Sequence, residues 1–461
     1  MLPAVSSRSF SLRKLTGSVA CVLLAACSSD PAPSPGPPSS LRDVDASAVS
    51  ARNIRVSWTP FGNGTVAILR AVSGSDAFTE VARKPGNHGR FLDLALDPDT
   101  TYAYRLARCE KNVCQTPYET EPVTTLPTEF PPIDLKVASS GFDDDIVVFG
   151  TYGISATLFT EGHMIAVDRA GRAIWEYATH EHGPISEVQP LANGTLATGQ
   201  YQILVQIDLD GRELYRWSGG SAHHDIDRLP DGRFAFLFFD PFEVAPGVSW
   251  LGDGVHILDE AGAQVAWEWR AQDHIPVTDF HPKDIRANET GMGYNWTHAN
   301  AITVDDEGTK VRINIRNLNR IYQVDVATKQ TDWIMGDGGD FGEGLWDHCH
   351  DPEFLDDHHV LLFDNGMYRT PSHSRVIEVE FDPQQKTAQI VWEHRESPDF
   401  FSPALGSAHQ QNNGNVFVTD GMNGRLFETT RRHEKVWELT VKKGFWIYKA
   451  VTVPRSFFTE W

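Results

Sequence analysis

The sequence predicts an all-β protein in which a small N-terminal β-sandwich precedes a six-bladed β-propeller. Short strand-like segments separated by Gly-, Asn-, Pro- and Asp-rich turns fill residues 41–127. From residue 128 to residue 461 a pattern of two consecutive hairpins recurs. Two hairpins make four strands, which is one propeller blade, and six copies predict six blades. An array of β-sandwiches is the alternative, but sandwiches seldom repeat this regularly.

The N-terminus predicts export. Residues 1–27 begin with basic side chains, continue through an apolar run at 18–26, and end in Leu-Ala-Ala-Cys. The apolar run is too short to span a membrane as a mature helix, so it predicts a removable signal. The last four residues resemble a bacterial lipobox, which implies cleavage before Cys27 and lipid attachment there. The alternative is an ordinary signal peptide without a lipid.

The residues after the predicted lipid site indicate the membrane. Ser28 stands where an Asp would resemble the inner-membrane retention signal, so we expect a lipid anchor in the outer membrane, facing the periplasm or the cell surface. Residues 28–40 (SSDPAPSPGPPSS) form the Pro/Ser linker that such an anchor needs.

Charge and cysteine content restrict the partners and the compartment. A formal net charge of −22 argues against a nucleic-acid partner, because phosphate binding needs a basic surface. An anionic substrate would need a local group of cationic side chains. Cys109 and Cys114 flank a four-residue turn and are predicted to close a small disulfide loop in an oxidising compartment. For Cys349 we favour a buried structural role over a ligand or a nucleophile.

The sandwich prediction covers residues 41–127. Strands are predicted at 54–58, 66–72 and 102–109. Trp58, followed by LALDPDTTYAYRL at 94–106, resembles a fibronectin type III module. Such modules space or bind other domains, so we expect no chemistry here.

The repeat consists of an Asp-rich hairpin that ends in aromatic residues, followed by a second hairpin. The first type is predicted at 165–177, 205–217, 255–269, 321–334, 376–393 and 425–438. The second type has a polar start, an apolar pair, a Gly/Asp turn and an apolar strand, as in HDIDRLPDGRFAFLF. The sixth copy, IYKAVTVPRSFF, is degenerate.

Histidines recur at one register of the second hairpin. Its first residue is Ser186, His224, His298, His350, and then Gly406 or Ser407. Innermost strands line the channel of a propeller, so we expect the three histidines to face one spot. Structural histidines or a zinc site are the alternatives. Because neighbours on a strand face opposite ways, we favour surface or turn positions for Asp225 and Asp351 over the alternative that they orient the adjacent histidines.

Five segments, in order, resemble the bacterial arylsulfate sulfotransferases that use no nucleotide donor. They are SAHHDIDRLPDG (221–232), NWTHANAI (295–302), INIRNLNRIYQVD (313–325), HCHDPEF (348–354) with LLFDNG (361–366), and SRVIEVEFD (374–382). The resemblance implies a six-bladed propeller that moves a sulfuryl group from a phenolic sulfate ester to a phenol. It also implies a ping-pong route through a sulfohistidine and no cofactor.

The resemblance also implies roles for individual residues. It gives His350 as the covalent nucleophile, with His224, His298 and Arg316 as further catalytic residues. In the His-His-Asp motif, His223 is the less favoured choice for the catalytic histidine. We assign His223, His348 and Asn300 to substrate binding, the last because it lies two residues from His298 on the same strand face.

The sequence departs from the family pattern in two places. His348 lies two residues before His350, which leaves open which of them attacks. Residues 317–319 (Asn-Leu-Asn) follow Arg316 where some members carry His-Gln, which leaves the acceptor preference open.

The chemistry agrees with these residue types. Sulfuryl transfer resembles phosphoryl transfer, in which positioning and electrostatics dominate. A neutral imidazole is a competent nucleophile, and an Arg guanidinium fits sulfate oxygens.

Two other functions remain open. One is a non-catalytic propeller that binds an anionic or glycan ligand, and the other is a metal-dependent hydrolase or lyase built on the same histidines. The sequence names neither donor nor acceptor, and it leaves the oligomeric state open.

Two weaker patterns complete the predictions. Residues 336–344 (GDGGDFGEG) predict a loop over the channel mouth and lack the spacing of a calcium site. Four aromatic residues predict either a phenol-binding wall or blade packing, with packing favoured: Trp296, Trp346, Tyr368 and Phe400.

Overall fold

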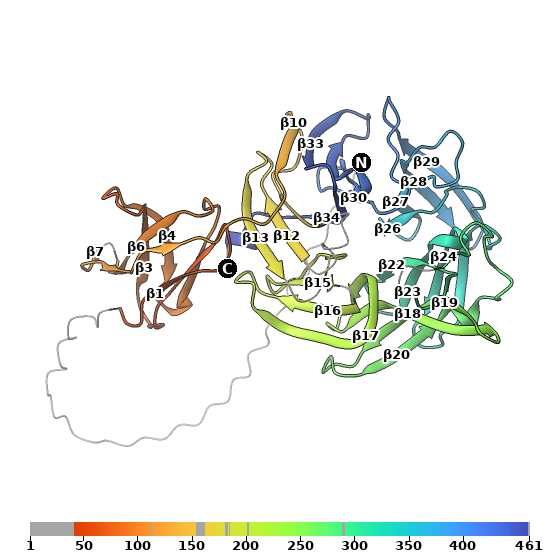
Figure 1. Ribbon diagram of the computed structural model, residues 1–461, viewed down its shortest axis with the longest axis horizontal. Coiled ribbons are helices and arrows are strands. Elements are labelled where there is room, and N and C mark those ends of the chain that lie inside the picture. The colour runs from red at the N-terminus through yellow and green to blue at the C-terminus, as the bar shows by residue number, and fades with distance from the viewer. Residues whose placement is uncertain are drawn as a thin grey trace, which may run out of the picture. The chain divides into compact units, whose positions relative to one another are not determined.

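The computed structural model describes residues 41–459 except 112, 154–161, 180–182, 184, 201 and 288–290. Strands dominate this part of the chain, and its helices are single turns such as α1 (Ala271–His274) and α2 (Ser456–Thr459) (Figure 1). In the described ranges no helix is both long and apolar enough to cross a membrane. The predicted signal, Cys27 and the Pro/Ser linker lie outside the described residues.

Residues 45–124 form two antiparallel sheets around an apolar core. One sheet contains β1 (Asp45–Ala48), β2 (Ile54–Ser57) and β5 (Arg90–Asp93). The other contains β4 (Thr79–Pro85), β3 (Thr65–Val72), β6 (Thr101–Glu110) and β7 (Val113–Cys114), with β8 (Tyr118–Glu119) and β9 (Val123–Thr124) paired to β6. The three predicted strands are therefore confirmed as β2, β3 and β6, and a disulfide joins Cys109 to Cys114.

The remaining strands form groups of four antiparallel strands. One sheet contains β34 (Phe445–Val453), β11 (Ile146–Gly153), β12 (Gly162–Val167) and β13 (Ala173–Thr179). A second contains β22 (Ala299–Val304), β23 (Lys310–Ile315), β24 (Arg320–Asp325) and β25 (Thr331–Gly336). A third contains β26 (His350–Phe354), β27 (His359–Asp364), β28 (Arg375–Asp382) and β29 (Thr387–His394). A fourth sheet contains β30 (Ser407–Gln410), β31 (Val416–Asp420), β32 (Arg425–Thr429) and β33 (Lys435–Val441), with β10 (Ile133–Ala138) on its outer edge.

A longer sheet joins two further groups through one shared strand. It runs through β14 (Gln189–Pro190), β15 (Leu196–Gln200), β16 (Gln202–Ile207), β17 (Glu213–Arg228), β18 (Phe234–Ala245), β19 (Val248–Leu258) and β20 (Val265–Arg270), and β21 (Tyr294–Asn295) pairs with β19. The first part of β17 pairs mainly with β16, and the part from Ala222 to Arg228 pairs with β18. All six predicted hairpins are confirmed, as β12–β13, β16–β17, β19–β20, β24–β25, β28–β29 and β32–β33.

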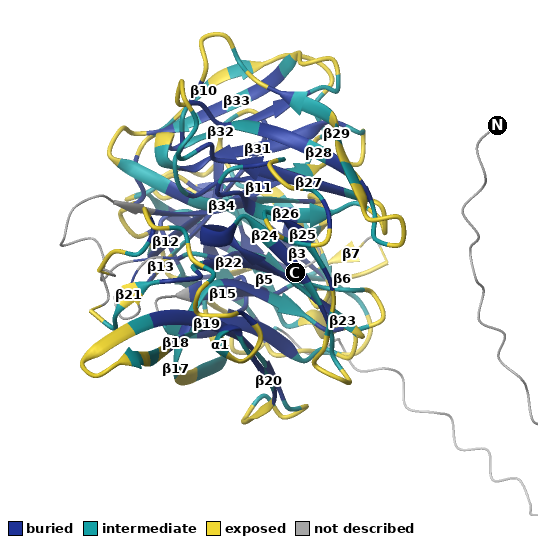
Figure 2. Cartoon of the chain, turned by 90° about the vertical axis from the view of Figure 1, so that its right-hand side faces the viewer, coloured by how far each residue is buried: buried dark blue, intermediate teal, exposed yellow. Residues whose placement is uncertain are grey.

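The sheets surround a common centre, and the two ends of the repeat region interlock (Figure 1). The leading strands β17, β22, β26, β30 and β34 contact one another in that order. The first strand of the region, β10, pairs with β33, and the last, β34, pairs with β11. This exchange pairs strands from both ends of the region, which stabilises a closed arrangement. Apolar side chains of neighbouring sheets interdigitate, so burial is concentrated in the strands (Figure 2).

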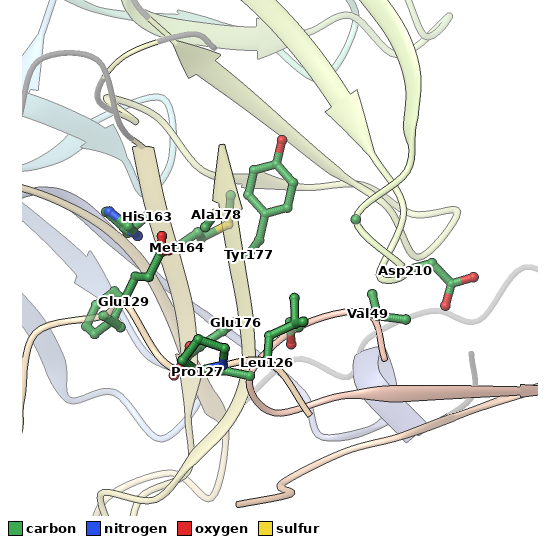
Figure 3. A pocket seen from close by; sticks show the side chains of 14 residues that line it. Val49, Leu126, Pro127, Glu129, His163, Met164, Glu176, Tyr177, Ala178 and Asp210 are labelled. Atoms are coloured by element: carbon green, nitrogen blue, oxygen red, sulfur yellow. The ribbon is translucent and has the colours of Figure 1, made fainter. Parts of the chain in front are cut away.

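The N-terminal sheets contact the repeat region at β13. The main-chain oxygen of Ile174 accepts hydrogen bonds from the side-chain amide of Asn53 (3.2 Å) and from the main-chain nitrogen of Ala95 (2.9 Å). Arg52 forms an ion pair with Glu176 at 3.2 Å. A cavity of ≈ 380 Å³ lies beside this contact (Figure 3). These contacts order the module against the repeat region.

Candidate active site

Three histidines from consecutive strand groups meet where the leading strands surround the centre. His224 lies in β17, His298 directly precedes β22, and His350 begins β26. The ring centroids of His224 and His298 are 5.0 Å apart. Burial and the charges of neighbouring groups, His350 among them, hold the pKa values of His224 and His298 well below the ordinary histidine value. The rings of His224 and His298 are therefore in contact, and His350 lies near enough for its charge to affect both.

The backbone is irregular at these positions. His224 and His298 have φ values of 56° and 50°, a left-handed conformation that non-glycine residues rarely adopt. Each strand also shifts its pairing register close to its histidine, over residues 223–226, 299–301 and 350–353. Bulges and strained residues of this kind recur beside functional sites, where they redirect side chains.

His350 is held in a single tautomer. Its Nδ1 lies 2.6 Å from Oδ1 of Asn365, whose amide nitrogen donates to the main-chain oxygens of Ser402 (2.7 Å) and Leu405 (2.8 Å). Because the amide oxygen can only accept, Nδ1 of His350 carries the hydrogen and Nε2 carries the lone pair. Burial, followed by the charge of Arg316, lowers the pKa of His350 to about 3. His350 is therefore a neutral imidazole with a nucleophilic Nε2.

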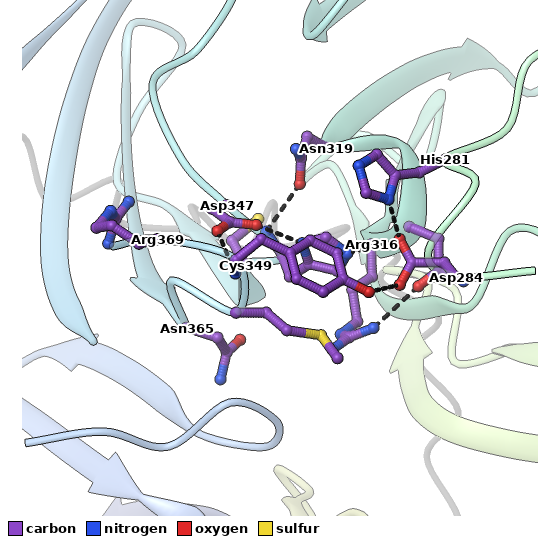
Figure 4. Close-up of polar contacts among 12 residues, drawn as sticks. His281, Asp284, Arg316, Asn319, Asp347, Cys349, Asn365 and Arg369 are labelled. Carbon is purple, nitrogen blue, oxygen red and sulfur yellow. Dashed lines mark hydrogen bonds and ion pairs between the residues drawn. The ribbon is translucent and has the colours of Figure 1, made fainter. Parts of the chain in front are cut away.

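His348 has the opposite character. Its Nδ1 lies 2.5 Å from Asp347 and its Nε2 lies 2.9 Å from Asp284, so both ring nitrogens face carboxylates. Figure 4 shows these two carboxylates. Burial lowers the pKa of His348, but the two carboxylates outweigh burial and the net pKa is raised. His348 is therefore an imidazolium without a free lone pair.

Arg316 is buried beside His350. It begins a single 3₁₀ turn, Arg316–Leu318, that follows β23, and its Nη2 donates to the main-chain oxygen of Pro403 at 3.2 Å. The main-chain nitrogen of Leu405 in the same segment lies 3.3 Å from Nε2 of His350. Burial lowers the pKa of Arg316, yet a guanidinium stays charged, and its Nε has no hydrogen-bond partner in the described part of the chain.

His223 contacts His224, Phe239 and Asp253. Its ring stacks on Phe239 at a centroid distance of 3.9 Å, and its Nδ1 lies 2.6 Å from Nδ1 of His224. Its Nε2 is in ion-pair contact with Asp253 at 3.1 Å. The Nδ1 of His298 accepts a hydrogen bond from the side-chain amide of Asn295 at 2.8 Å, which places the hydrogen of that ring on Nε2.

Asn300 and Cys349 support the strand that carries His350. The Asn300 amide donates to the main-chain oxygen of Cys349 (3.1 Å) and accepts from Asn314 (2.6 Å), so both its polar atoms are engaged by protein groups. Cys349 is a buried free thiol, and burial raises its pKa well above the ordinary value. This agrees with the structural role favoured for Cys349.

The prediction for Asp225 and Asp351 is wrong. Both side chains lie inside the ring of strands, where Lys449 of β34 binds Asp351 (2.9 Å), Glu187 (3.3 Å) and Asp225 (3.7 Å). His409 adds an ion pair to Asp351 at 3.1 Å. The alternation rule fails here because of the bulges and of left-handed backbone at His224 and at Asp351 itself, where φ is 46°. We call these five side chains, Glu187, Asp225, Asp351, His409 and Lys449, the axial ion cluster.

Sequence reasoning missed the axial ion cluster and the carboxylates beside His348. The lysine in IYKAVTVPRSFF was a usable signal, because it interrupts an otherwise strand-like segment in the copy that lacks the histidine. Asp284 had no local pattern to identify it, because its partner His348 lies 64 residues away along the chain. Asp347 directly precedes His348 and Asn365 lies in the LLFDNG segment, but neither pattern shows which histidine nitrogen the side chain faces.

The four predicted aromatic residues divide between packing and the site. Trp296, Trp346 and Phe400 are buried in apolar clusters, which agrees with the favoured alternative. Tyr368 instead donates its hydroxyl hydrogen to Asp284 at 2.5 Å. Burial and that carboxylate raise the pKa of Tyr368 to about 12. One aromatic ring therefore lies next to His348.

The predicted loop at 336–344 follows β25. Gly336 is the last residue of β25, and the next two residues, Asp337 and Gly338, line a cavity of ≈ 340 Å³ together with residues 278–281 and 317–320. The carboxylate of Asp337 accepts a hydrogen bond from Asn319 at 2.9 Å, and the main-chain nitrogen of His348 donates to the same asparagine at 2.8 Å. Asn319 thus connects this loop to the site. Of the residues that the structure describes, no group of three or more His, Cys, Asp or Glu is arranged to hold a metal ion.

Fold and site together define an all-β protein whose strand groups surround a buried histidine–arginine centre. The family model described as Arylsulfotransferase (ASST) matches residues 135–449, which is more than half of the 461-residue chain. The chain belongs to the arylsulfotransferase family. As a family member it is a sulfotransferase that acts on small molecules.

Solved structures show a more distant likeness. A protein of unknown function from Bacteroides caccae has a TM-score of 0.45 at 13% identity and covers 68% of this chain and 99% of its own. The β-propeller domain of Myceliophteria thermophila Cps50 (Swd1) has a TM-score of 0.38 at 11% identity, covering 67% of this chain and 88% of its own. Both scores lie below 0.5, so the fold description depends on the sheet topology above. No curated protein sequence matches this chain.

Proposed function

We propose that this protein transfers a sulfuryl group from a phenolic sulfate ester to a phenol, by a ping-pong route through a sulfohistidine at His350. One observation carries the proposal: a neutral imidazole with its lone pair on Nε2 is buried beside a permanently charged guanidinium. The neutral ring supplies the nucleophile, and Arg316 supplies a charge for the sulfuryl oxygens.

In the first half-reaction, Nε2 of His350 attacks sulfur. An N–S bond forms as the S–O(aryl) bond breaks, and the phenolate leaves with the electron pair. Arg316 and the Nε2–H of His298 face the developing charge on the sulfuryl oxygens, which is the electrostatic contribution that such transfers need. The main-chain N–H of Leu405 donates to Nε2 of His350 at 3.3 Å, so it must release this lone pair before attack and is then a third donor for the sulfuryl oxygens.

In the second half-reaction, an acceptor phenol attacks the same sulfur. The S–O bond to the acceptor forms as the N–S bond breaks, and the electron pair returns to Nε2 of His350. The phenolic proton needs a base, and His224 is the neutral imidazole that remains available. His348 is excluded from the nucleophilic role in this proposal because both its nitrogens carry hydrogens toward carboxylates.

We also infer a six-bladed propeller for the repeat region. The sheet order supports it: the groups β34-β11-β12-β13, β14 to β17, β17 to β20, β22 to β25, β26 to β29 and β30 to β33 each have four strands. For residues 41–127 we infer a fibronectin type III-like spacer. Its support is the buried Trp58 and a tyrosine corner, in which the Tyr102 hydroxyl accepts from the main-chain nitrogen of Asp97 at 3.0 Å.

We also propose that the protein is exported and anchored to the membrane through a lipid on Cys27. The N-terminal sequence supports this part of the proposal. Incorporation of labelled palmitate by the wild type, and its loss in Cys27→Ser, would support the lipid anchor. A label that persists in Cys27→Ser would contradict it.

The activity is tested with the purified full-length chain in mild detergent and 4-nitrophenyl sulfate. We expect a burst of nitrophenolate near one equivalent per enzyme, and steady release once phenol is added. His350→Ala should abolish both, whereas His256→Gln, at a partly buried histidine outside the site, should retain both. Mass spectrometry of the acceptor-free enzyme should place one sulfuryl group on the peptide that contains His350.

Two results would overturn the proposal. Absence of nitrophenolate from a series of aryl sulfates, with sulfate esters still bound, would support a ligand-binding protein. Turnover that a chelator abolishes and a divalent metal restores would support a metal-dependent enzyme.

A further inference from the structure

A single buried carboxylate connects two of the three histidine segments. Asp253 lies in β19 and is 3% exposed. Its Oδ1 is 3.1 Å from Nε2 of His223. Its Oδ2 accepts hydrogen bonds from the hydroxyl of Thr297 (2.5 Å) and the main-chain nitrogen of Ala299 (2.7 Å), the two neighbours of His298. Asp253 therefore holds the backbone around His298 with one oxygen and faces His223 with the other.

The contacts of Asp253 determine where the hydrogens of two rings lie. Nε2 of His223 lies 3.1 Å from a carboxylate oxygen, off the direction of a hydrogen bond, and at this distance the negative charge favours a hydrogen over a lone pair on Nε2. The lone pair of a neutral His223 is then on Nδ1. That atom is 2.6 Å from Nδ1 of His224, and two lone pairs cannot approach so closely, so Nδ1 of His224 donates. The lone pair of His224 is consequently on Nε2.

We propose that Asp253 is a positioning residue which, through His223, fixes the tautomer of His224 so that Nε2 of His224 accepts the proton of the acceptor phenol. This inference rests on the proposed function for its kinetic consequence. As the phenol oxygen bonds to sulfur and the N–S bond to His350 breaks, the phenolic proton moves to Nε2 of His224. The resulting imidazolium keeps its Nδ1–H toward His223, and the negative charge of Asp253 lies beyond that ring.

The surroundings of His224 show why this chain of contacts is needed. Among the residues that the structure describes, the groups that face His224 are His223, His298, His350, Arg316 and Tyr448, and none of these five is anionic. Burial and these neighbours lower the pKa of His224, which disfavours the protonated form needed in the second half-reaction. A carboxylate that acts through one intervening ring offsets part of this cost.

Asp253→Asn gives a directional test. The asparagine oxygen must remain at the Oδ2 position, because Thr297 and Ala299 both donate there. The amide nitrogen therefore lies next to Nε2 of His223, where its hydrogens favour a lone pair on that atom. His223 then carries its hydrogen on Nδ1, and His224 is forced to accept on Nδ1 and to carry its hydrogen on Nε2. The substitution thus reverses both tautomers at nearly constant volume.

The first measurement is independent of activity. In ¹⁵N-histidine-labelled protein, His224→Gln identifies the His224 signals by their loss. We expect wild-type His224 to be neutral with the hydrogen on Nδ1, and Asp253→Asn to move that hydrogen to Nε2. A wild-type ring with the hydrogen on Nε2, or an unchanged His224 spectrum in Asp253→Asn, overturns the inference. The wild-type spectrum is decisive even if the variant folds poorly.

The second measurement separates the half-reactions. In Asp253→Asn we expect the nitrophenolate burst to stay within about tenfold, because nitrophenolate leaves without a proton. Transfer to phenol should fall about 10²–10⁴-fold in kcat, as expected for a base in the wrong tautomer. The deficit should shrink with acidic phenols that are already ionised. Asp240→Asn, which removes another buried carboxylate paired with Arg270 and Gln272, should show no dependence on the acceptor.

The outcomes distinguish the two proposals. If the wild type releases no nitrophenolate, the proposed function fails, and the histidine spectra still decide whether Asp253 fixes the tautomer. If the wild type turns over and the Asp253→Asn deficit is equal for all acceptors, a structural role replaces the positioning role.

Discussion

Nδ1 of His350 lies 2.6 Å from the amide oxygen of Asn365, and the amide nitrogen of Asn365 is itself committed to two main-chain oxygens. This relationship makes the orientation of the amide unambiguous and thereby fixes the hydrogen of His350 on Nδ1. It also explains how a histidine within the reach of Arg316 presents a lone pair rather than a proton.

Asn365→Asp should convert an activity that is insensitive to mild acid into one that is lost in acid. The wild-type pKa of His350 is lowered to about 3, so its ring is neutral throughout the neutral range. A carboxylate at position 365 stabilises the imidazolium and raises this pKa, and a protonated ring cannot attack. The rate of the nitrophenolate burst should therefore fall as the pH decreases through the new pKa. A burst rate with the same pH profile as the wild type would contradict this account, and Asn365→Ser serves as an uncharged control.

Arg316→Lys should cost roughly 10²-fold or more in kcat/KM for 4-nitrophenyl sulfate. The guanidinium is buried and presents a fork of donors, and an ammonium at this depth cannot reproduce that geometry. Because the charge acts on the sulfuryl oxygens in both half-reactions, burst and transfer rates should fall together. A loss confined to one half-reaction would contradict this role. The control is Arg228→Lys, because Arg228 is a partly exposed arginine outside the site.

The sequence predicted the hairpins and the approximate position of the site because both follow from repetition. Hairpin pairing depends on turn residues and alternation, which are local, and the register of His224, His298 and His350 follows from aligned repeats. The placement of Asp225 and Asp351 could not be predicted, because bulges and left-handed residues override alternation at those positions.

The tautomers of the histidines could not be predicted from the sequence either. Asn365, Asp253 and Asp284 act on histidines 15, 30 and 64 residues away along the chain. Only folding shows which carboxylate or amide faces which nitrogen. The sequence also leaves open whether His348 or His350 attacks. The proposal chooses His350 because Asp284 and Asp347 face both ring nitrogens of His348, a contact that no sequence motif indicates.

His348→Gln should weaken the fold more at low pH than at high pH. The pKa of His348 is raised in the folded state above its unfolded value, so its stabilising contribution is fully present below the unfolded pKa and is lost as the pH rises through the folded pKa. Urea denaturation across this range should show the largest difference from the wild type in mild acid. His350 sulfation should persist in His348→Gln. Loss of the sulfuryl label in this variant, with the fold intact, would transfer the nucleophilic role to His348.

Lys449→Met should destabilise the protein by about 3–5 kcal/mol, because it leaves three carboxylates of the axial ion cluster without their shared cation. Burial alone would lower the pKa of Lys449, but Asp225, Asp351 and Glu187 raise it well above its ordinary value, so the lysine is charged in the folded protein. The loss should be smaller near pH 5 than near pH 8, since orphaned carboxylates take up protons as the pH falls.

Urea denaturation at the two pH values measures this effect, with Lys136→Met as the exposed control, for which a change of less than about 1 kcal/mol is expected. Asp225 and Asp351 directly follow His224 and His350, so the loss of Lys449 should also lower turnover in the fraction that remains folded. A variant with wild-type stability and wild-type turnover would show that the cluster neither closes the ring of strands nor positions the two histidines.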